Sequence, residues 1–376
     1  MSDQIEALYD GRLALEQRVL PIYRAPFFEA LAARCAGGMM FFAGQPRADE
    51  GIITSASLNL ARLTSAQNIH IFSTASPLYF CYQRGLMRWL EDCNPDALIV
   101  EANFRYLSSP AAMRWMRERG RPVIGWGLGA PASRGALNGL RKRFLGQFDA
   151  LIAYSQRGAG QYASCVPGVP VFVAPNAVAP APTEPLPLRP AGFTSRPVLL
   201  FVGRLQARKR IPALLQACAN LPGQLTPRLI IVGDGPEMET LRSEAQNVFP
   251  SAEFVGARHG VELAEFFRMA DLFVLPGTGG LAVQQAMSFG LPVIVAQGDG
   301  TQDDLVRPGN GWQIPPGDDR ALLSTLLDAL SDPARLRCMG SESYRIVSDE
   351  INLQNMVSVF VKALNSINRV EAVSNS

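Results

Sequence analysis

The stretch Leu272–Val295 constrains the fold more than any other part of the sequence. Its residues predict a buried strand at Leu272–Leu275, a glycine-rich turn at Pro276–Gly280, a helix at about Leu281–Phe289 and a second buried strand from Pro292. Glycines between a strand and a helix leave backbone N–H groups and the positive end of a helix dipole at one point. Such a corner can bind a phosphate, or the glycines can simply form a tight turn.

Apolar strands alternate with helices along the whole chain. We expect strands at Leu13–Leu20, Met39–Ala43, Ile69–Phe72, Ala97–Val100, Pro122–Trp126, Ala150–Ala153 and Val171–Val173, and again at Val198–Val202, Leu229–Val232, Glu253–Val255, Leu272–Leu275 and Val293–Val295. Helices are expected between them, including one over Leu78–Leu90. Uniformly apolar strands that alternate with helices are typical of parallel sheets covered on both faces. The predicted fold class is α/β, with two doubly wound, Rossmann-like domains.

The domain boundary is expected where proline accumulates. Six prolines occur in Ala179–Pro197, and this composition favours an extended, semi-rigid connection. We therefore predict a first domain over residues 1–178, a linker over 179–197 and a second domain over 198–350. The last helix, about 353–367, is expected to join the first domain. Two such domains predict a ligand in the cleft between them, at the carboxyl ends of the strands.

Composition favours a compact, soluble, cytoplasmic protein. The chain has 376 residues, of which 48% are hydrophobic and 18% charged. No apolar run approaches the roughly 20 residues that cross a bilayer, and the acidic start lacks the apolar core of a secretory signal. The six cysteines show no C-x-x-C or Cys/His spacing, so we expect reduced thiols rather than disulfides or a zinc site.

Two cations follow the first strand of the second domain. Arg204 and Lys209 stand five residues apart in the loop after Gly203, where a strand end and a helix start come together. Arginine can donate two parallel hydrogen bonds to phosphate oxygens, and lysine adds a point charge. This pair favours a diphosphate ligand, whereas Arg208 and Arg210 are interpreted as a solvated surface cluster.

Two further strand ends carry weaker signals. Gly233-Asp-Gly-Pro, which contains Gly235, is either an ordinary turn or part of a ligand site. Phe254-Val-Gly could place Val255 and its backbone against a nucleobase, or it could be core packing. A nicotinamide-dependent enzyme is excluded because no G-x-G-x-x-G motif follows the strand before Gly233.

The order of these motifs resembles the donor domain of family 4 retaining glycosyltransferases, which have the GT-B fold. The resemblance is carried by G-R-x-x-x-x-K (Gly203–Lys209), V-G-D-G-P (Val232–Pro236), F-V-G (Phe254–Gly256), A-D-L-F-V-L-P (Ala270–Pro276) and G-G-L-x-x-x-Q-A-M-x-x-G-L-P-V-I (Gly279–Ile294). Ala174-Pro-Asn-Ala-Val resembles the P-N-G-V that ends the first domain in this family. The resemblance covers about residues 170–330 strongly and residues 1–150 loosely.

The resemblance implies roles for individual residues. Arg204 and Lys209 would act as catalytic cations on the donor diphosphate. The donor would also contact Gly203, Gly235, Val255, Gly277, Thr278, Gly279, Gly280, Leu281 and Gln285. No cofactor and no metal are implied, because the nucleotide-sugar is a substrate and UDP or GDP the product.

The chain departs from the family pattern at three positions. The paired glutamates of the family fall at Gly277, which has no side chain for the donor sugar, and at Gln285, which keeps hydrogen bonding but not charge. The usual histidine after the strand Pro122–Trp126 has no match. His70 is expected in a strand, and His259 in an exposed loop.

The acceptor side is assigned to four residues of the first domain. Tyr23 and Arg24 lie in the corner Leu20–Phe28, which resembles the acceptor-side start of some family members. Glu101 follows a strand and offers a carboxylate to the acceptor or as a base, and Trp126 stands where the histidine is expected.

A basic region spans Arg105–Arg157, with ten basic residues and two acidic ones. Leu137, Leu140, Phe144 and Leu145 form one helical stripe beside Arg141, Lys142 and Arg143, and Met113–Arg119 adds cations beside aromatic side chains expected to be exposed. This pattern favours contact with an anionic membrane surface, or equally an ordinary helix whose apolar stripe faces its own sheet. Nucleic acid is not expected, since no recognition motif accompanies the charge.

Together these observations predict a retaining, metal-independent hexosyltransferase. It would move a sugar from a UDP- or GDP-sugar to a glycan or lipid-linked acceptor in bacterial envelope or exopolysaccharide synthesis, in the cytoplasm or at the inner face of the membrane. The alternative is a catalytically inactive GT-B partner subunit that binds nucleotide weakly.

Overall fold

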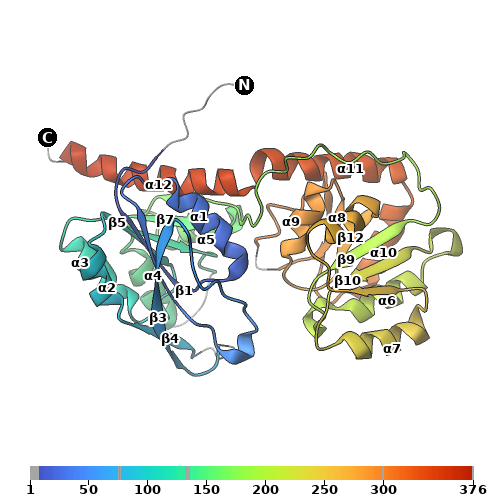
Figure 1. Ribbon diagram of the computed structural model, residues 1–376, viewed down its shortest axis with the longest axis horizontal. Helices are drawn as coiled ribbons and strands as arrows, with labels where there is room; N and C mark the ends of the chain where they lie inside the picture. Colours follow the sequence, from blue (N-terminus) through green and yellow to red (C-terminus); the bar gives the residue numbers. More distant parts are fainter. Residues whose placement is uncertain (1–7, 75, 77, 132–135, 299, 375–376) are drawn as a thin grey trace. The chain divides into compact units, whose positions relative to one another are not determined.

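The computed structural model describes residues 8–74, 76, 78–131, 136–298 and 300–374. The chain forms two compact units (Figure 1). Unit 1 consists of Met1–Val178 together with Leu353–Ser376, and unit 2 of Ala179–Asn352, in each case as far as the residues are described. Among these residues, no helix has the length and apolar character needed to cross a membrane.

Unit 1 is built on an eight-stranded sheet of order β4-β3-β2-β1-β5-β6-β7-β8. Its strands are β1 (Leu13–Val19), β2 (Met39–Gly44), β3 (Ala61–Ile71), β4 (Phe80–Arg84), β5 (Ala97–Glu101), β6 (Val123–Gly127), β7 (Ala150–Ala153) and β8 (Val171–Val173). All neighbours pair in parallel except β3 and β4, which are antiparallel. The central strands β5 and β7 are almost wholly buried, as their apolar sequences require.

Helices cover this sheet. They are α1 (Ala25–Ala32), α2 (Leu86–Cys93), α3 (Ser109–Arg117), α4 (Ala136–Leu145), α5 (Gln156–Cys165) and α12 (Leu353–Ser374), with short 3₁₀ turns at η1 (Ile22–Arg24) and η2 (Ala48–Glu50). Helix α12 belongs to this unit because Phe360 is fully buried against Phe27 and Trp126, with ring centroids 4.9 and 5.0 Å apart.

Unit 2 is built on a six-stranded, fully parallel sheet of order β11-β10-β9-β12-β13-β14. Its strands are β9 (Val198–Val202), β10 (Arg228–Val232), β11 (Glu253–Gly256), β12 (Leu272–Leu275), β13 (Val293–Ala296) and β14 (Gly311–Ile314). Its helices are α6 (Ile211–Ala219), α7 (Met238–Val248), α8 (Gly260–Met269), α9 (Leu281–Ser288), α10 (Asp319–Leu330) and α11 (Pro333–Arg345), with short turns at η3 (Ala207–Lys209), η4 (Gly223–Leu225) and η5 (Ile346–Glu350).

The proline-rich stretch contains no helix or strand, as its composition predicts, but it packs along unit 2. Arg189 donates hydrogen bonds to the carbonyl oxygens of Phe267, Ala270 and Phe289, at 2.9, 3.0 and 2.8 Å. The stretch is therefore anchored to the second unit rather than free.

The predicted elements are wrong in two places. The helix expected over Leu78–Leu90 is instead strand β4 followed by α2, and β3 begins eight residues before the predicted Ile69. Strand β4 is at the edge of the sheet and β3 lies next to it. Their polar and apolar residues alternate, so they lack the continuous apolar run that is typical of a central strand. The edge strand β14 was not predicted, because Gly311-Trp-Gln-Ile is short and half polar.

Candidate functional site

Three neighbouring strands of unit 2 bring the predicted donor residues to one edge of the sheet. Strands β10, β9 and β12 are adjacent and parallel, so the loops that follow them share the carboxyl edge. Two of these loops are joined directly, since Leu205 donates from its backbone to Asp234 O at 2.9 Å. The fold thus places the loop of Arg204 and Lys209 between the Gly233–Gly235 turn and the glycine-rich corner 276–280.

Lys209 is held inside the glycine-rich corner. Its side chain is only 6% exposed, and its Nζ donates to the carbonyl oxygens of Thr278 at 2.7 Å and Gly279 at 3.3 Å. The backbone N–H of Thr278 donates in return to Arg208 O at 3.1 Å. The third donor of the ammonium has no partner among the described residues. An anion that enters the corner can therefore accept a hydrogen bond from a cation already fixed in place.

Burial lowers the pKa of Lys209 to about 8, with a smaller contribution from the neighbouring charge of Arg208. A desolvated ammonium without a carboxylate partner is an unbalanced positive charge. A bound diphosphate would balance this charge and raise the pKa again. The electrostatics of the corner therefore favour an anionic ligand.

Gly277 is packed tightly against the loop that carries Lys209. A methyl group there would lie 2.5 Å from Cα of Lys209 and closer still to the carbonyl oxygen of Arg208. No side chain fits without moving this backbone. In this chain the backbone of the loop that carries Lys209 therefore lies directly against Gly277.

The other predicted donor residues have different surroundings. Gly235 is a packing glycine, because a methyl group there would lie 2.7 Å from the backbone nitrogen of Leu205. Gln285 is partly buried on α9, whereas its neighbour Gln284 is fully buried and donates to Ile351 O at 2.8 Å. The remaining positions lie at the carboxyl edge as follows: Gly203, Val255 and Gly280 are partly buried, and Arg204, Thr278, Gly279 and Leu281 are exposed.

Sequence reasoning set Arg208 aside, but the structure places it at the corner. A methyl group on Gly279 would lie 3.2 Å from a guanidinium nitrogen of Arg208 and 3.5 Å from Nζ of Lys209. Arg210, by contrast, forms an exposed ion pair with Asp319 at 2.7 Å. One signal could have separated them: Arg208 directly precedes the lysine that the motif singles out.

In unit 1, Arg24 is a packing residue of the interior. It is 7% exposed, donates to the side-chain oxygen of Asn176 and lies 5.6 and 5.3 Å from the ring centroids of Trp126 and Tyr154. This contact joins the corner Leu20–Phe28 to the Ala174–Val178 segment. Tyr23 is 42% exposed.

Trp126 is 1% exposed and packs on Phe27, Phe28, Phe360 and Tyr154. Its place in the core counts against the acceptor contact predicted for it. Both histidines lie as expected: His70 is in β3 and contacts the Tyr79 hydroxyl at 2.9 Å, and His259 is exposed before α8.

Glu101 is partly buried and lies near a second acid, Glu16, which is fully buried. Its Oε1 accepts from the backbone N–H of Arg18 at 2.7 Å, and its carboxyl is hydrogen-bonded to Tyr106. Nearby Glu16 is 0% exposed, and neither of its carboxyl oxygens has a hydrogen-bond partner among the described residues. Burial, reinforced by the charge of Glu101, holds the pKa of Glu16 well above its usual value. Sequence reasoning missed Glu16, since a single acid inside a strand gives no signal of its own.

The basic region is partly an ordinary packed surface. Met113 and Trp115 are buried, so the expectation that side chains of Met113–Arg119 expose aromatic surface is wrong. In α4, Phe144 and Leu145 are buried while Leu140 is 58% exposed, and the side chain of Leu137 lies outside the described part. The apolar stripe therefore faces its own unit at two of its positions.

Solved structures identify the fold. The chain is similar to a sucrose-phosphate synthase from Thermosynechococcus elongatus, with a TM-score of 0.66, 20% identity and coverage of 96% of this chain and 99% of the other. It is also similar to Alr3699/HepE from Anabaena in complex with UDP, with a TM-score of 0.66, 16% identity and coverage of 94% and 99%. At these identities the likeness concerns the fold, and the fold is GT-B.

The family follows from the sequence of unit 2. Residues 189–345 match the family model "Glycosyl transferases group 1". This part of the chain thus matches group 1 glycosyl transferases, in agreement with the resemblance seen in its motifs, and the whole chain has the GT-B fold.

The chain matches only part of the length of its curated relatives. A GDP-mannose-dependent alpha-mannosyltransferase of Mycobacterium tuberculosis is 37% identical over 33% of this chain and 31% of its own length. A GDP-mannose-dependent alpha-(1-6)-phosphatidylinositol monomannoside mannosyltransferase of Mycolicibacterium smegmatis is 28% identical over 58% and 61%. The matches thus span between about a third and three fifths of these two proteins.

Gly277→Ala tests the tight contact between the two loops. We expect the free energy of unfolding of unit 2 to fall by about 1–3 kcal/mol in urea, because a methyl group must displace backbone. Gly192→Ala is the matched control in the same unit, since a methyl group there meets nothing within 4 Å. Equal stability of the two variants would contradict the geometry.

Glu16→Gln tests the buried acid through pH. A carboxyl group whose pKa is raised on folding does not destabilise the folded state below its unfolded pKa. As the pH rises above that value, the free energy of unfolding falls, because the unfolded chain ionises more readily. The variant removes this cost, so its thermal midpoint should exceed that of the wild type at pH 8, with the gap closing towards pH 5. Glu91→Gln, on the exposed face of α2, should follow the wild type at every pH. The same pH slope in all three proteins would contradict the assignment.

Proposed function

We propose that the chain transfers a hexose-type sugar from a UDP- or GDP-sugar to a glycan or lipid-linked acceptor. The observation that carries this proposal is the partly desolvated ammonium of Lys209, fixed by two carbonyl oxygens in a glycine-rich corner before a helix. That arrangement suits a diphosphate leaving group. The partial matches to GDP-mannose-dependent mannosyltransferases support a mannose-type donor and a role in envelope glycans.

The proposed reaction needs little acid or base catalysis from side chains. The bond between the anomeric carbon and the diphosphate oxygen breaks, and negative charge develops on the diphosphate. Lys209, Arg208 and Arg204 stabilise that charge from positions set before the reaction, which is the most effective form of electrostatic catalysis. The acceptor oxygen bonds to the anomeric carbon on the face from which the diphosphate departs, and an oxygen of the diphosphate takes the acceptor's proton. The anomeric configuration is therefore retained. Metal independence and the absence of a cofactor are part of this proposal.

The acceptor is assigned to unit 1. Tyr23 is exposed beside the buried Arg24, and Glu101 stands at the carboxyl end of β5. The exposed cations Lys142 and Arg143 of α4 favour a location at an anionic membrane surface on the cytoplasmic side.

A second candidate function is a non-catalytic GT-B subunit that binds nucleotide. Gly277 favours it, because this position has no side chain to contact the donor sugar, where the resemblance implies a glutamate. A panel of UDP- and GDP-sugars offered to the purified protein separates the two. Binding without transfer or hydrolysis would support the subunit and overturn the enzyme.

Lys209→Met tests the leaving-group assignment. We expect turnover of the best donor in that panel to fall by about 10²–10³-fold, because the methionine keeps the packing and removes the charge that meets the diphosphate. Arg210→Met is the matched control, since it removes a neighbouring cation that is paired with Asp319. Turnover of the control should stay within about twofold of the wild type. Equal turnover of the two variants would refute the role of Lys209.

A further inference from the structure

Strands β3 and β4 form an antiparallel hairpin that extends beyond the rest of the sheet of unit 1 (Figure 1). Strand β2 ends at Gly44, opposite Ala66, so residues 67–71 of β3 pair with β4 alone among the described strands. Strand β4 is at the edge of the sheet. The proposed function does not use this hairpin.

The inner face of the hairpin is largely polar and is bonded to the body of unit 1. The strand register places on it Asn68, His70, Cys81 and Gln83. Asn68 donates to the carbonyl oxygens of Arg18 and Gln45 at 2.7 and 3.0 Å. Gln83 donates to that of Gln17 at 3.1 Å. These hydrogen bonds fix which face of the hairpin points inwards.

The outer face is apolar and exposed. Ile69 lies opposite Tyr82 on this face, and Ile71 lies opposite Phe80. The exposed fractions of Ile69, Ile71 and Tyr82 are between 41% and 43%. An antiparallel sheet with one face in water normally turns its apolar side chains inwards and its polar ones outwards. The order is reversed here, and contiguous exposed apolar side chains mark an interaction surface.

Two more apolar side chains are exposed next to this face. Phe72 directly follows β3 and is 60% exposed, and Leu78, two residues before β4, is also exposed. The φ of Phe72 is +63°, in the left-handed region that an aromatic residue rarely adopts. Phe72 thus contributes little burial and adds backbone strain, and strain of this kind is typical of functional positions.

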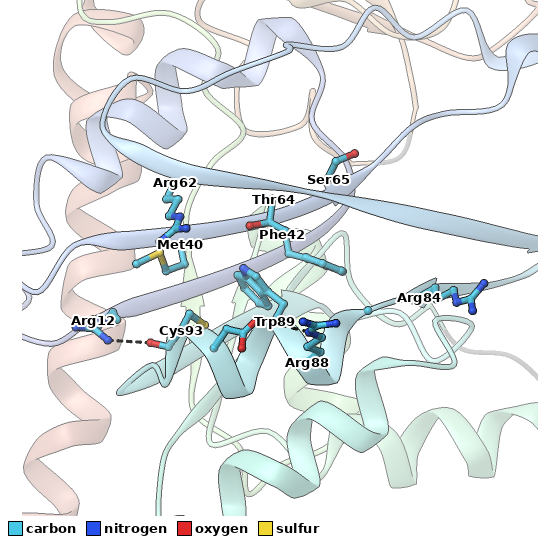
Figure 2. A pocket seen from close by; sticks show the side chains of 12 residues that line it. Arg12, Met40, Phe42, Arg62, Thr64, Ser65, Arg84, Arg88, Trp89 and Cys93 are labelled. Atoms are coloured by element: carbon cyan, nitrogen blue, oxygen red, sulfur yellow. Dashed lines mark hydrogen bonds and ion pairs between the residues drawn. The ribbon is translucent and has the colours of Figure 1, made fainter.

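Arg84 adds a positive charge to the outer face. The register places it opposite Gln67, on the same face as Ile69 and Tyr82, and it is exposed. It stands at one end of a hollow of about 640 Å³ between β3 and α2, and its side chain lies apart from that of Arg62 (Figure 2). The Arg84 guanidinium is therefore available to whatever contacts the apolar side chains.

The sequence around the hairpin contains no acid. Residues 51–90 have no aspartate or glutamate and three arginines, Arg62, Arg84 and Arg88. Arg47 adds a cation near the hairpin, since it donates to Phe72 O at 3.2 Å, although it is also paired with Asp49 at 3.3 Å. This charge complements an anionic bilayer, whereas the same surface of a second copy of the chain would bring arginines against arginines.

We infer that the outer face of the β3–β4 hairpin, together with Phe72, is a membrane-contact surface for an anionic bilayer. Ile69, Ile71 and Phe72 enter the boundary between headgroups and acyl chains. Arg84 meets the lipid phosphates, and Tyr82 lies at the interface between the two regions. This inference rests on the membrane location that we propose for the chain, but not on the transfer reaction, and it adds an apolar contact to the cations of α4.

Co-sedimentation of the full chain with vesicles of phosphatidylcholine, with and without phosphatidylglycerol, tests this surface. Ile69→Ser/Ile71→Ser removes apolar side chains from the outer face. Leu8→Ser/Leu60→Ser is the matched control, because both leucines are exposed and precede β1 and β3, at the opposite edge of the same sheet.

Ile69→Ser/Ile71→Ser should weaken binding to the anionic vesicles about tenfold or more, because two apolar side chains no longer insert. The control pair should change binding by less than about twofold. Equal weakening by the two pairs would overturn the inference. Unchanged thermal midpoints verify that the variants remain folded.

Lys142→Ala/Arg143→Ala separates the hairpin from the membrane location proposed through α4. If this pair weakens binding and the hairpin variant does not, the inference is overturned while the location stands. If the wild type binds neither kind of vesicle, both are overturned.

Phe72→Asn separates membrane contact from folding. Asparagine tolerates a positive φ, so the thermal midpoint should stay at or above that of the wild type, whereas vesicle binding should fall about threefold or more. A lower midpoint with unchanged binding would assign Phe72 to packing and contradict the inference.

Discussion

The donor side of this protein depends on the contact between two loops, in which the ammonium of Lys209 lies on the carbonyl oxygens of Thr278 and Gly279. The contact requires Gly277, because any larger residue would collide with the backbone of Arg208 and Lys209. It also requires adjacent parallel strands β9 and β12, whose carboxyl ends deliver both loops to one place. The carbonyl contacts, the glycine and the adjacent strands therefore all contribute to holding the ammonium of Lys209 in place.

The same contact joins a residue that matches the family 4 motif, Lys209, to one that departs from it, Gly277. In this chain the loop of Arg208 and Lys209 packs directly against Gly277, and a methyl group at this position would collide with the backbone of that loop. In the proposed reaction, Lys209 and the neighbouring Arg208 would balance the charge of a diphosphate. In that reaction, specificity for the sugar would come from other groups, and Gln285 on α9 is one partly exposed polar side chain near the corner.

Much of this arrangement could be predicted from the sequence, and the failures have physical causes. Central strands such as Leu272–Leu275 are continuous apolar runs, and their bounds were predicted correctly. Edge strands β4 and β14 were missed because half-exposed strands mix polar and apolar residues. Arg208 was interpreted as a solvated surface residue, because the sequence alone does not distinguish the arginines of a basic run. The burial of Trp126 and the unpaired carboxyl of Glu16 arise from tertiary packing, which no local pattern records.

The most direct test of the central claim is a crystal structure of the wild-type chain with its product nucleoside diphosphate bound. The account predicts a terminal phosphate oxygen within about 3.2 Å of Nζ of Lys209, beside the backbone of Gly279 and Gly280. A nucleotide bound elsewhere, or with its phosphates turned away from Lys209, would contradict it.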